Sequence, residues 1–166
     1  LIQALEVLKK KGISFNLSII GEQDQRRFPQ NINVKAFGLI SNESQMVEKY
    51  QEADIFLLPS IQDNLPNTVM EAMACGTPVV AFDCGGVKDM ISHKTNGFLA
   101  ENRNVKEMTE GILYFAESDN LRRASKAARL TVEEEFSEPK VAQQYEGLYW
   151  SSIQFFENQK DLIAKT

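Results

Sequence analysis

The 166-residue sequence has few side chains that are suited to metal binding or nucleophilic catalysis. His93 is the single histidine, and Cys75 and Cys84 are the two cysteines. The spacing of the cysteines matches no zinc or thiol-redox motif, so we expect no metal centre. A Ser–His dyad has little support with one histidine in the chain. Unpaired cysteines are typical of a reducing compartment, and a cytoplasmic protein is therefore expected.

Long apolar runs and an excess of basic residues are also absent. No run of about 18 apolar residues occurs, so a transmembrane helix is not expected. The net charge is −5, which argues against a general nucleic-acid binder. The sequence starts at Leu1 rather than at a methionine, and we expect that it begins inside a longer chain.

The most informative stretch begins with residues 55–58, a short apolar run that is typical of a strand in a parallel sheet. Residues 62–67 are polar and include a proline, which predicts a loop. Residues 69–75 predict a helix that ends at a glycine, and residues 79–82 predict a second buried strand. This order places a helix N-terminus just beyond the end of a strand. Free backbone N–H groups and the helix dipole make such a place suitable for binding an anion.

Two carboxylates flank this predicted anion site, Asp63 in the loop and Glu71 in the helix. Carboxylates do not bind phosphate, but they accept hydrogen bonds from sugar hydroxyls, so the pair suggests a nucleotide sugar. The alternative is that Asp63 is a turn residue and Glu71 a solvated helix residue. This alternative is weaker for Glu71, which precedes an apolar run on a helix that should pack on the sheet. A buried, unpaired carboxylate is costly, so we expect a hydroxyl or amide partner.

Strands and helices alternate along the rest of the chain, which predicts an α/β, doubly wound parallel sheet of the Rossmann-like type. The predicted strands are residues 14–20, 32–37, 54–58, 78–82 and 97–100. Further predicted helices are residues 1–11, 22–28, 43–52, 87–91, 105–116, 121–136 and 138–159. No repeat or linker divides the sequence, so residues 1–166 are expected to form one domain.

The stretch from Pro59 to Ala81 resembles the donor-site signature, E-x7-E, of GT-B fold glycosyltransferases of family 4. Asp63 stands where the family has the first glutamate, and the Asn64-Leu65-Pro66-Asn67 loop replaces a Gly-Phe-Gly-x loop. Further matching segments occur in the family's order. They are residues 17–21, 34–38, 50–55, 85–91 and 96–99. The resemblance covers about residues 17–149 and implies the C-terminal, nucleotide-sugar-binding half of such an enzyme.

The resemblance implies roles for individual residues. Asp63 and Glu71 would be the catalytic pair, with Glu71 on the ribose hydroxyls and Asp63 on hydroxyls of the transferred sugar. The backbone N–H groups of Asn67 and Thr68 would face the diphosphate, and residues 37–40 would hold the base. The expected donor-binding residues are Gly21, Phe37, Gly38, Leu39, Ile40, Asn64, Leu65, Asn67, Thr68 and Glu71.

The resemblance also implies an activity. The expected activity is that of a retaining hexosyltransferase in polysaccharide biosynthesis. Such an enzyme uses a UDP- or GDP-type sugar as donor substrate and needs no further cofactor. The acceptor would be a glycan or a lipid-linked sugar, which allows peripheral association with the inner face of the membrane. One alternative is a sugar-nucleotide epimerase of related fold, although its additional acid and base groups are not evident. Another is a non-catalytic nucleotide-binding module.

Parts that the family places before the first residue are missing. They are an acceptor-binding Rossmann-like domain and a first strand that brings an arginine and a lysine to the donor diphosphate. In the strand order 3-2-1-4-5-6, that first strand would run between residues 14–20 and 54–58. We therefore expect the fragment alone to be inactive. The last helix, about residues 138–159, is expected to pack toward the absent N-terminal domain.

Overall fold

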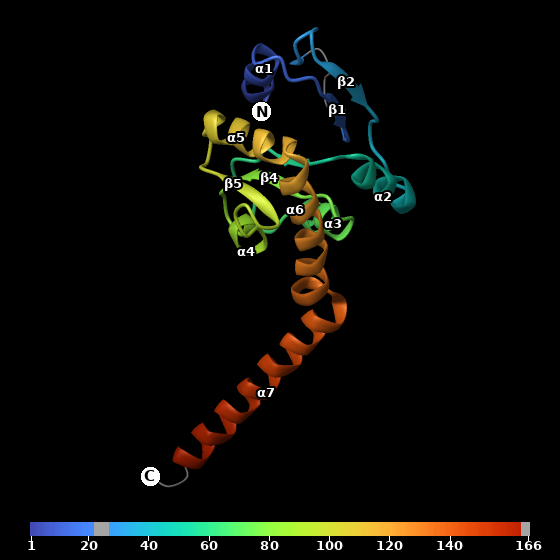
Figure 1. The fold of residues 1–166 in the computed structure, drawn as a ribbon. Coiled ribbons are helices and arrows are strands. Elements are labelled where there is room, and N and C mark those ends of the chain that lie inside the picture. The colour runs from blue at the N-terminus through green and yellow to red at the C-terminus, as the bar shows by residue number, and fades with distance from the viewer. Residues whose placement is uncertain (22–26, 164–166) are drawn as a thin grey trace.

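The computed structural model describes residues 1–21 and 27–163, and these form two small parallel sheets covered by helices (Figure 1). The strands are β1 (Asn16–Ile19), β2 (Asn33–Ala36), β3 (Phe56–Leu58), β4 (Val79–Phe82) and β5 (Gly97–Ala100). The helices are α1 (Ile2–Lys10), α2 (Glu43–Glu52), α3 (Asn67–Ala74), α4 (Val87–Met90), α5 (Val105–Ala116), α6 (Ser118–Thr131), the π-helical segment η2 (Val132–Phe136) and α7 (Glu138–Ile163). The predicted short helix over 22–28 lies mostly outside the described residues.

All five predicted strands are present, and all pairings among them are parallel, which confirms the predicted fold class. One sheet contains β1 and β2, and the other has the order β3-β4-β5. Within residues 1–21 and 27–163, β1 and β3 are not hydrogen-bonded neighbours. Direct pairing of these two strands would have contradicted the expected strand order. The strand expected between them stays a prediction.

Strand β4 is buried on both of its faces, as the centre of a doubly wound sheet requires. Val79 and Ala81 pack in a cluster with residues of α3, whereas Val80 and Phe82 pack with residues of α5 on the opposite face. Figure 1 shows α5 on one side of β4 and β5, with α3 and α4 on the other. Burial of a valine or phenylalanine side chain in this way contributes about 1.5–3 kcal/mol. This core fixes the carboxyl ends of the strands, where the candidate site lies.

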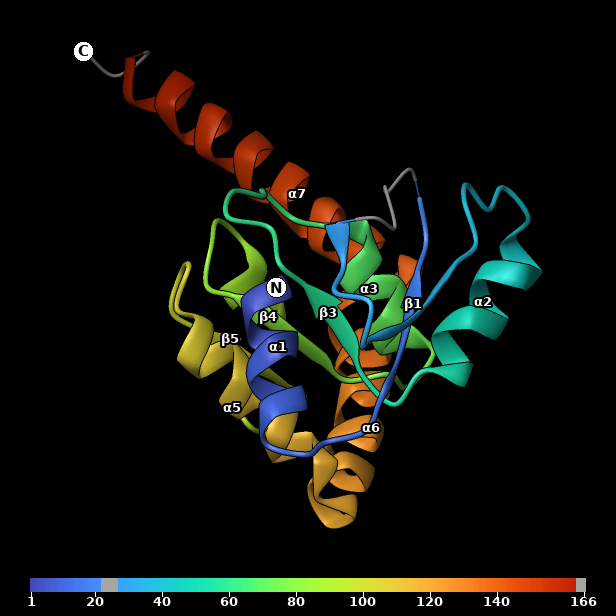
Figure 2. The ribbon, with the colours of Figure 1, turned by 90° about the horizontal axis from the view of Figure 1, so that it is seen from above.

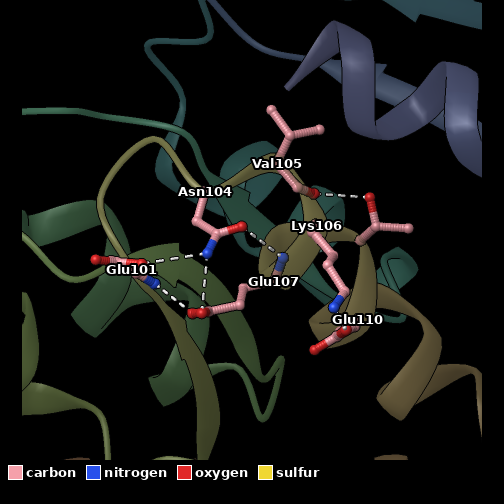
Figure 3. Close-up of polar contacts among 7 residues, drawn as sticks. Glu101, Asn104, Val105, Lys106, Glu107 and Glu110 are labelled. Atoms are coloured by element: carbon pink, nitrogen blue, oxygen red, sulfur yellow. Dashed lines mark hydrogen bonds and ion pairs between the residues drawn. The ribbon is translucent and has the colours of Figure 1, made fainter.

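A polar network fixes the turn between β5 and α5 (Figure 3). The side-chain oxygen of Asn104 accepts a hydrogen bond from the backbone N–H of Glu107 at 3.2 Å, so Asn104 caps α5. Its amide nitrogen donates to the carboxylates of Glu107 at 2.9 Å and Glu101 at 3.3 Å. Glu107 in turn accepts the backbone N–H of Glu101 at 2.7 Å. The network holds Asn102, which reaches the candidate site.

Helix α7 extends away from the rest of the domain in both ribbon views (Figure 1, Figure 2). Apolar side chains along its described part are exposed. They are Tyr145, Leu148, Tyr149, Trp150, Ile153, Phe155 and Phe156. The expected packing of this helix on an N-terminal domain stays a prediction. None of the helices in the described part of the chain is both long and apolar enough to cross a bilayer.

Candidate functional site

The N-terminus of α3 lies just beyond the carboxyl end of β3, as the sequence pattern indicates. The helix begins at Asn67, two residues earlier than predicted, and Pro66 is its N-cap. Asn67 and Thr68 are exposed, and their N–H groups belong to the first turn, which has no acceptor inside the helix. These N–H groups and the helix dipole therefore present a partial positive charge to solvent.

Glu71 lies one turn further along α3, and its carboxylate has a hydroxyl partner. The Tyr50 hydroxyl donates a hydrogen bond to Oε2 of Glu71 at 2.9 Å. Tyr50 is only 4% exposed, and burial together with this hydrogen bond raises the pKa of its hydroxyl. The expected hydroxyl partner is therefore present, although Glu71 itself is exposed. The packing of the rest of α3 does not reach its side chain.

Three hydrogen bonds hold the loop that carries Asp63. The backbone N–H of Gly86 donates to the carbonyl oxygen of Asn64 at 2.5 Å, and the Asn102 amide donates to the carbonyl oxygen of Ile61 at 2.9 Å. The Cys84 thiol donates to the carbonyl oxygen of Ser60 at 3.4 Å. Sequence reasoning did not assign Gly86 or Asn102 to the site, because their partners are distant in the chain.

Asp63 is half-buried beside a hollow of about 530 Å³. Its lining includes Asp63, Asn64, Asp83, Cys84, Gly85 and Asn102. Burial raises the pKa of the Cys84 thiol, and the neighbouring Asp63 carboxylate raises it further, so the thiol is protonated near neutral pH. The hollow therefore presents carboxylate and amide groups, which suit a ligand rich in hydroxyls. Leu65, the next residue after Asn64, is exposed and lies close to Gly86.

The residues expected to hold the base gather at the ends of β1 and β2. The Gly21 N–H donates to the Gly38 carbonyl oxygen at 2.7 Å, which joins the two strand ends. Phe37, Leu39 and Ile40 line a second hollow, of about 320 Å³. The Leu39 side chain is 76% exposed. Its other lining residues are Gln45, Glu48 and Lys49, so the hollow combines apolar and polar side chains, which suits a flat ligand with polar edges.

Helix α2 connects this second hollow to Glu71. Its Lys49 ammonium lies 4.8 Å from the centre of the Phe37 ring, and the next residue, Tyr50, donates to Glu71. The Lys35 ammonium also lies near this ring, 4.9 Å from its centre. The structure thus places the expected site residues in three groups: the hollow at Phe37, the start of α3, and the hollow at Asp63. In the described part of the chain, no cluster of three or more His, Cys, Asp or Glu residues could hold a metal ion.

The fold is that of the C-terminal half of a GT-B glycosyltransferase. The profile of the family described as "Glycosyl transferases group 1" matches residues 1–131, and the chain belongs to this family. This confirms the family that the sequence resembles.

Two curated bacterial relatives and one solved structure illustrate the similarity. An uncharacterised glycosyltransferase of Haemophilus influenzae is 33% identical over 163 residues, with 89% of this chain and 44% of that protein covered. The N,N'-diacetylbacillosaminyl-diphospho-undecaprenol alpha-1,3-N-acetylgalactosaminyltransferase of Campylobacter jejuni is 32% identical over 152 residues, with 89% and 39% covered. The sucrose-phosphate synthase of Thermosynechococcus elongatus has a TM-score of 0.76 at 22% identity, over 92% of this chain and 42% of that one. The chain therefore spans less than half the length of these proteins.

Proposed function

We propose that the chain is the donor-binding half of a retaining glycosyltransferase that transfers a hexosyl group from a nucleotide-diphosphate sugar. The observation that carries this proposal is the arrangement around α3. The helix presents its N-terminus beyond the carboxyl end of β3, and Glu71 follows one turn later with its carboxylate held by Tyr50. An anion site next to a fixed hydroxyl acceptor matches the diphosphate and ribose of such a donor.

The proposed chemistry depends on positioning and on charge. The N–H groups of Asn67 and Thr68 stabilise the negative charge that develops on the leaving diphosphate. Glu71 accepts hydrogen bonds from the ribose, while Phe37 and its neighbours hold the base. Asp63, which lines the other hollow, orients the transferred sugar. The donor is of the UDP or GDP type, and no metal cofactor takes part.

We further propose a longer protein around this half. A strand that precedes residue 1 lies between β1 and β3 and supplies cations for the diphosphate. An N-terminal domain binds a glycan or a lipid-linked acceptor, and α7 packs its exposed aromatic face against that domain. The Campylobacter jejuni relative, whose name includes diphospho-undecaprenol, supports a lipid-linked acceptor. Such an acceptor would place the enzyme at the cytoplasmic face of the membrane.

Thermal unfolding of the full-length protein with a panel of nucleoside diphosphates tests the proposal. A ligand at 100 times its Kd stabilises the folded state by about 2.7 kcal/mol, so the matching nucleotide should raise the Tm clearly. Nucleoside monophosphates are the control for the diphosphate contacts. Product analysis with the matching nucleotide sugar then separates transfer from epimerisation and from binding alone. Failure of every nucleoside diphosphate to shift the Tm would contradict the proposal.

A further inference from the structure

Tyr50 is held at two points besides its hydroxyl. Its ring packs edge-on against Phe56, with ring centres 5.6 Å apart and planes at 77°. Its carbonyl oxygen accepts a hydrogen bond from the Thr77 hydroxyl at 2.6 Å. The direction of the Tyr50 hydroxyl is therefore set by the core and not by the mobility of a surface side chain.

The Glu71 side chain has several rotatable bonds and lies at the surface, so an unrestrained carboxylate would adopt many orientations. The hydrogen bond from Tyr50 occupies Oε2 and restricts these orientations. Oε1 is not part of this hydrogen bond and can accept from a ligand. A group that is ordered before binding loses less entropy when the ligand arrives, which raises affinity.

We propose that Tyr50 is a positioning residue for nucleotide recognition, because its hydroxyl holds the Glu71 carboxylate in the orientation that receives the ribose hydroxyls. This inference rests on the proposed function. Glu71 contacts the nucleotide, and Tyr50 acts only through Glu71. A simpler role for Tyr50 is that of a core aromatic residue whose hydroxyl needs a partner. The two roles differ in whether the Tyr50 effect depends on Glu71.

A double-mutant cycle on the full-length protein distinguishes these roles. The variants are Tyr50→Phe, Glu71→Gln and their combination, and the measurement is the Kd for UDP and for GDP by calorimetry. We expect Tyr50→Phe to weaken binding of the preferred nucleotide about 3- to 10-fold and Glu71→Gln about 10- to 100-fold. The double variant should bind like Glu71→Gln alone, within about twofold, because coupled residues are not additive.

Tyr114→Phe is the matched control. The Tyr114 hydroxyl also donates to an oxygen atom, the carbonyl of Lys94 at 3.4 Å, but it lies in α5 outside both hollows. This variant should leave the Kd unchanged. If Tyr50→Phe is too unstable to measure, Glu71→Asp replaces it, since the shorter side chain draws the carboxylate away from Tyr50. Binding as weak as that of Glu71→Gln is expected there, despite the retained charge.

The outcomes separate the inference from the function on which it rests. Unchanged affinity in Glu71→Gln, or no binding of either nucleotide by the parent protein, would overturn the proposed function. Weak binding by Glu71→Gln with normal binding by Tyr50→Phe would overturn only the role of Tyr50. An equal loss from Tyr50→Phe in the presence and absence of Glu71 would show a purely structural role and would overturn the inference as well. If Glu71→Asp binds the nucleotide as tightly as the parent protein does, the inference about Tyr50 is likewise overturned.

Discussion

The backbone N–H of Gly86 donates to the carbonyl oxygen of Asn64 at 2.5 Å, which joins the loop that bears Asp63 to the turn after β4. A Cβ at Gly86 would lie 2.5 Å from that same oxygen, and a Cβ at Gly85 would lie 1.8 Å from the carbonyl oxygen of Asp63. Gly85 also has a φ of +53°, which favours glycine. The two glycines therefore allow a backbone approach that any side chain would block.

Replacing Gly86 should displace the Asp63 loop. We expect Gly86→Ala to lower the free energy of unfolding by about 1–3 kcal/mol, as overpacking does. The rate of sugar transfer should fall more than the nucleotide affinity does. The reason is that the proposed diphosphate contacts lie at the start of α3 and not in the displaced loop. Thermal unfolding and nucleotide Kd values of the full-length protein measure the two effects. Lys126→Ala, at an exposed residue of α6, is the control. Normal stability and transfer in Gly86→Ala would contradict this prediction.

Replacing Asp63 should impair sugar transfer, whereas replacing Glu71 should impair nucleotide binding. If Asp63 orients the transferred sugar, Asp63→Ala should reduce transfer strongly while the affinity for the free nucleoside diphosphate stays nearly unchanged. Its hollow is separate from the one at Phe37, which motivates the difference. Asp89→Ala, at an exposed residue of α4, is the control. Equal losses of transfer and of nucleotide affinity would place Asp63 on the nucleotide or in the loop scaffold.

The sequence predicts the strands and α3 well, because buried apolar runs and turn residues are local signals. The hydrogen bond between Tyr50 and Glu71 leaves no such signal, since it forms only when α2 packs beside α3. The same holds for the Gly86 contact with Asn64, which depends on how two loops meet. A helix continuous over 121–136 is also predicted, whereas α6 ends at Thr131 and the π-helical segment η2 follows. Helical periodicity alone does not distinguish these two forms.

Tyr50 should not ionise while the domain is folded. Burial raises its pKa above the ordinary value of 10.0, and the hydrogen bond to Glu71 adds to this. The folded state therefore favours the neutral hydroxyl, and the resulting stability is present below about pH 10 and lost as the pH rises further. At a pH above the ordinary tyrosine pKa, the tyrosinate absorbance of the folded parent protein and that of folded Tyr50→Phe should coincide. In denaturant at the same pH, the two absorbances should differ by the contribution of one tyrosinate. A difference in the folded state would contradict the prediction.

The last prediction concerns residues 1–166 as an isolated fragment. Within the described residues, β1 and β3 are edges of separate sheets, and an unpaired edge exposes backbone groups that a further strand would satisfy. If that strand carries the cations for the diphosphate, the fragment lacks both the strand and its charges. We therefore expect weaker nucleotide binding by the fragment than by the full-length protein, and no sugar transfer. The comparison needs the nucleotide Kd of both proteins and a transfer assay with the same acceptor, with full-length Glu71→Gln as the binding-deficient control. Sustained transfer by the fragment alone would show that the proposed strand and acceptor domain are not needed.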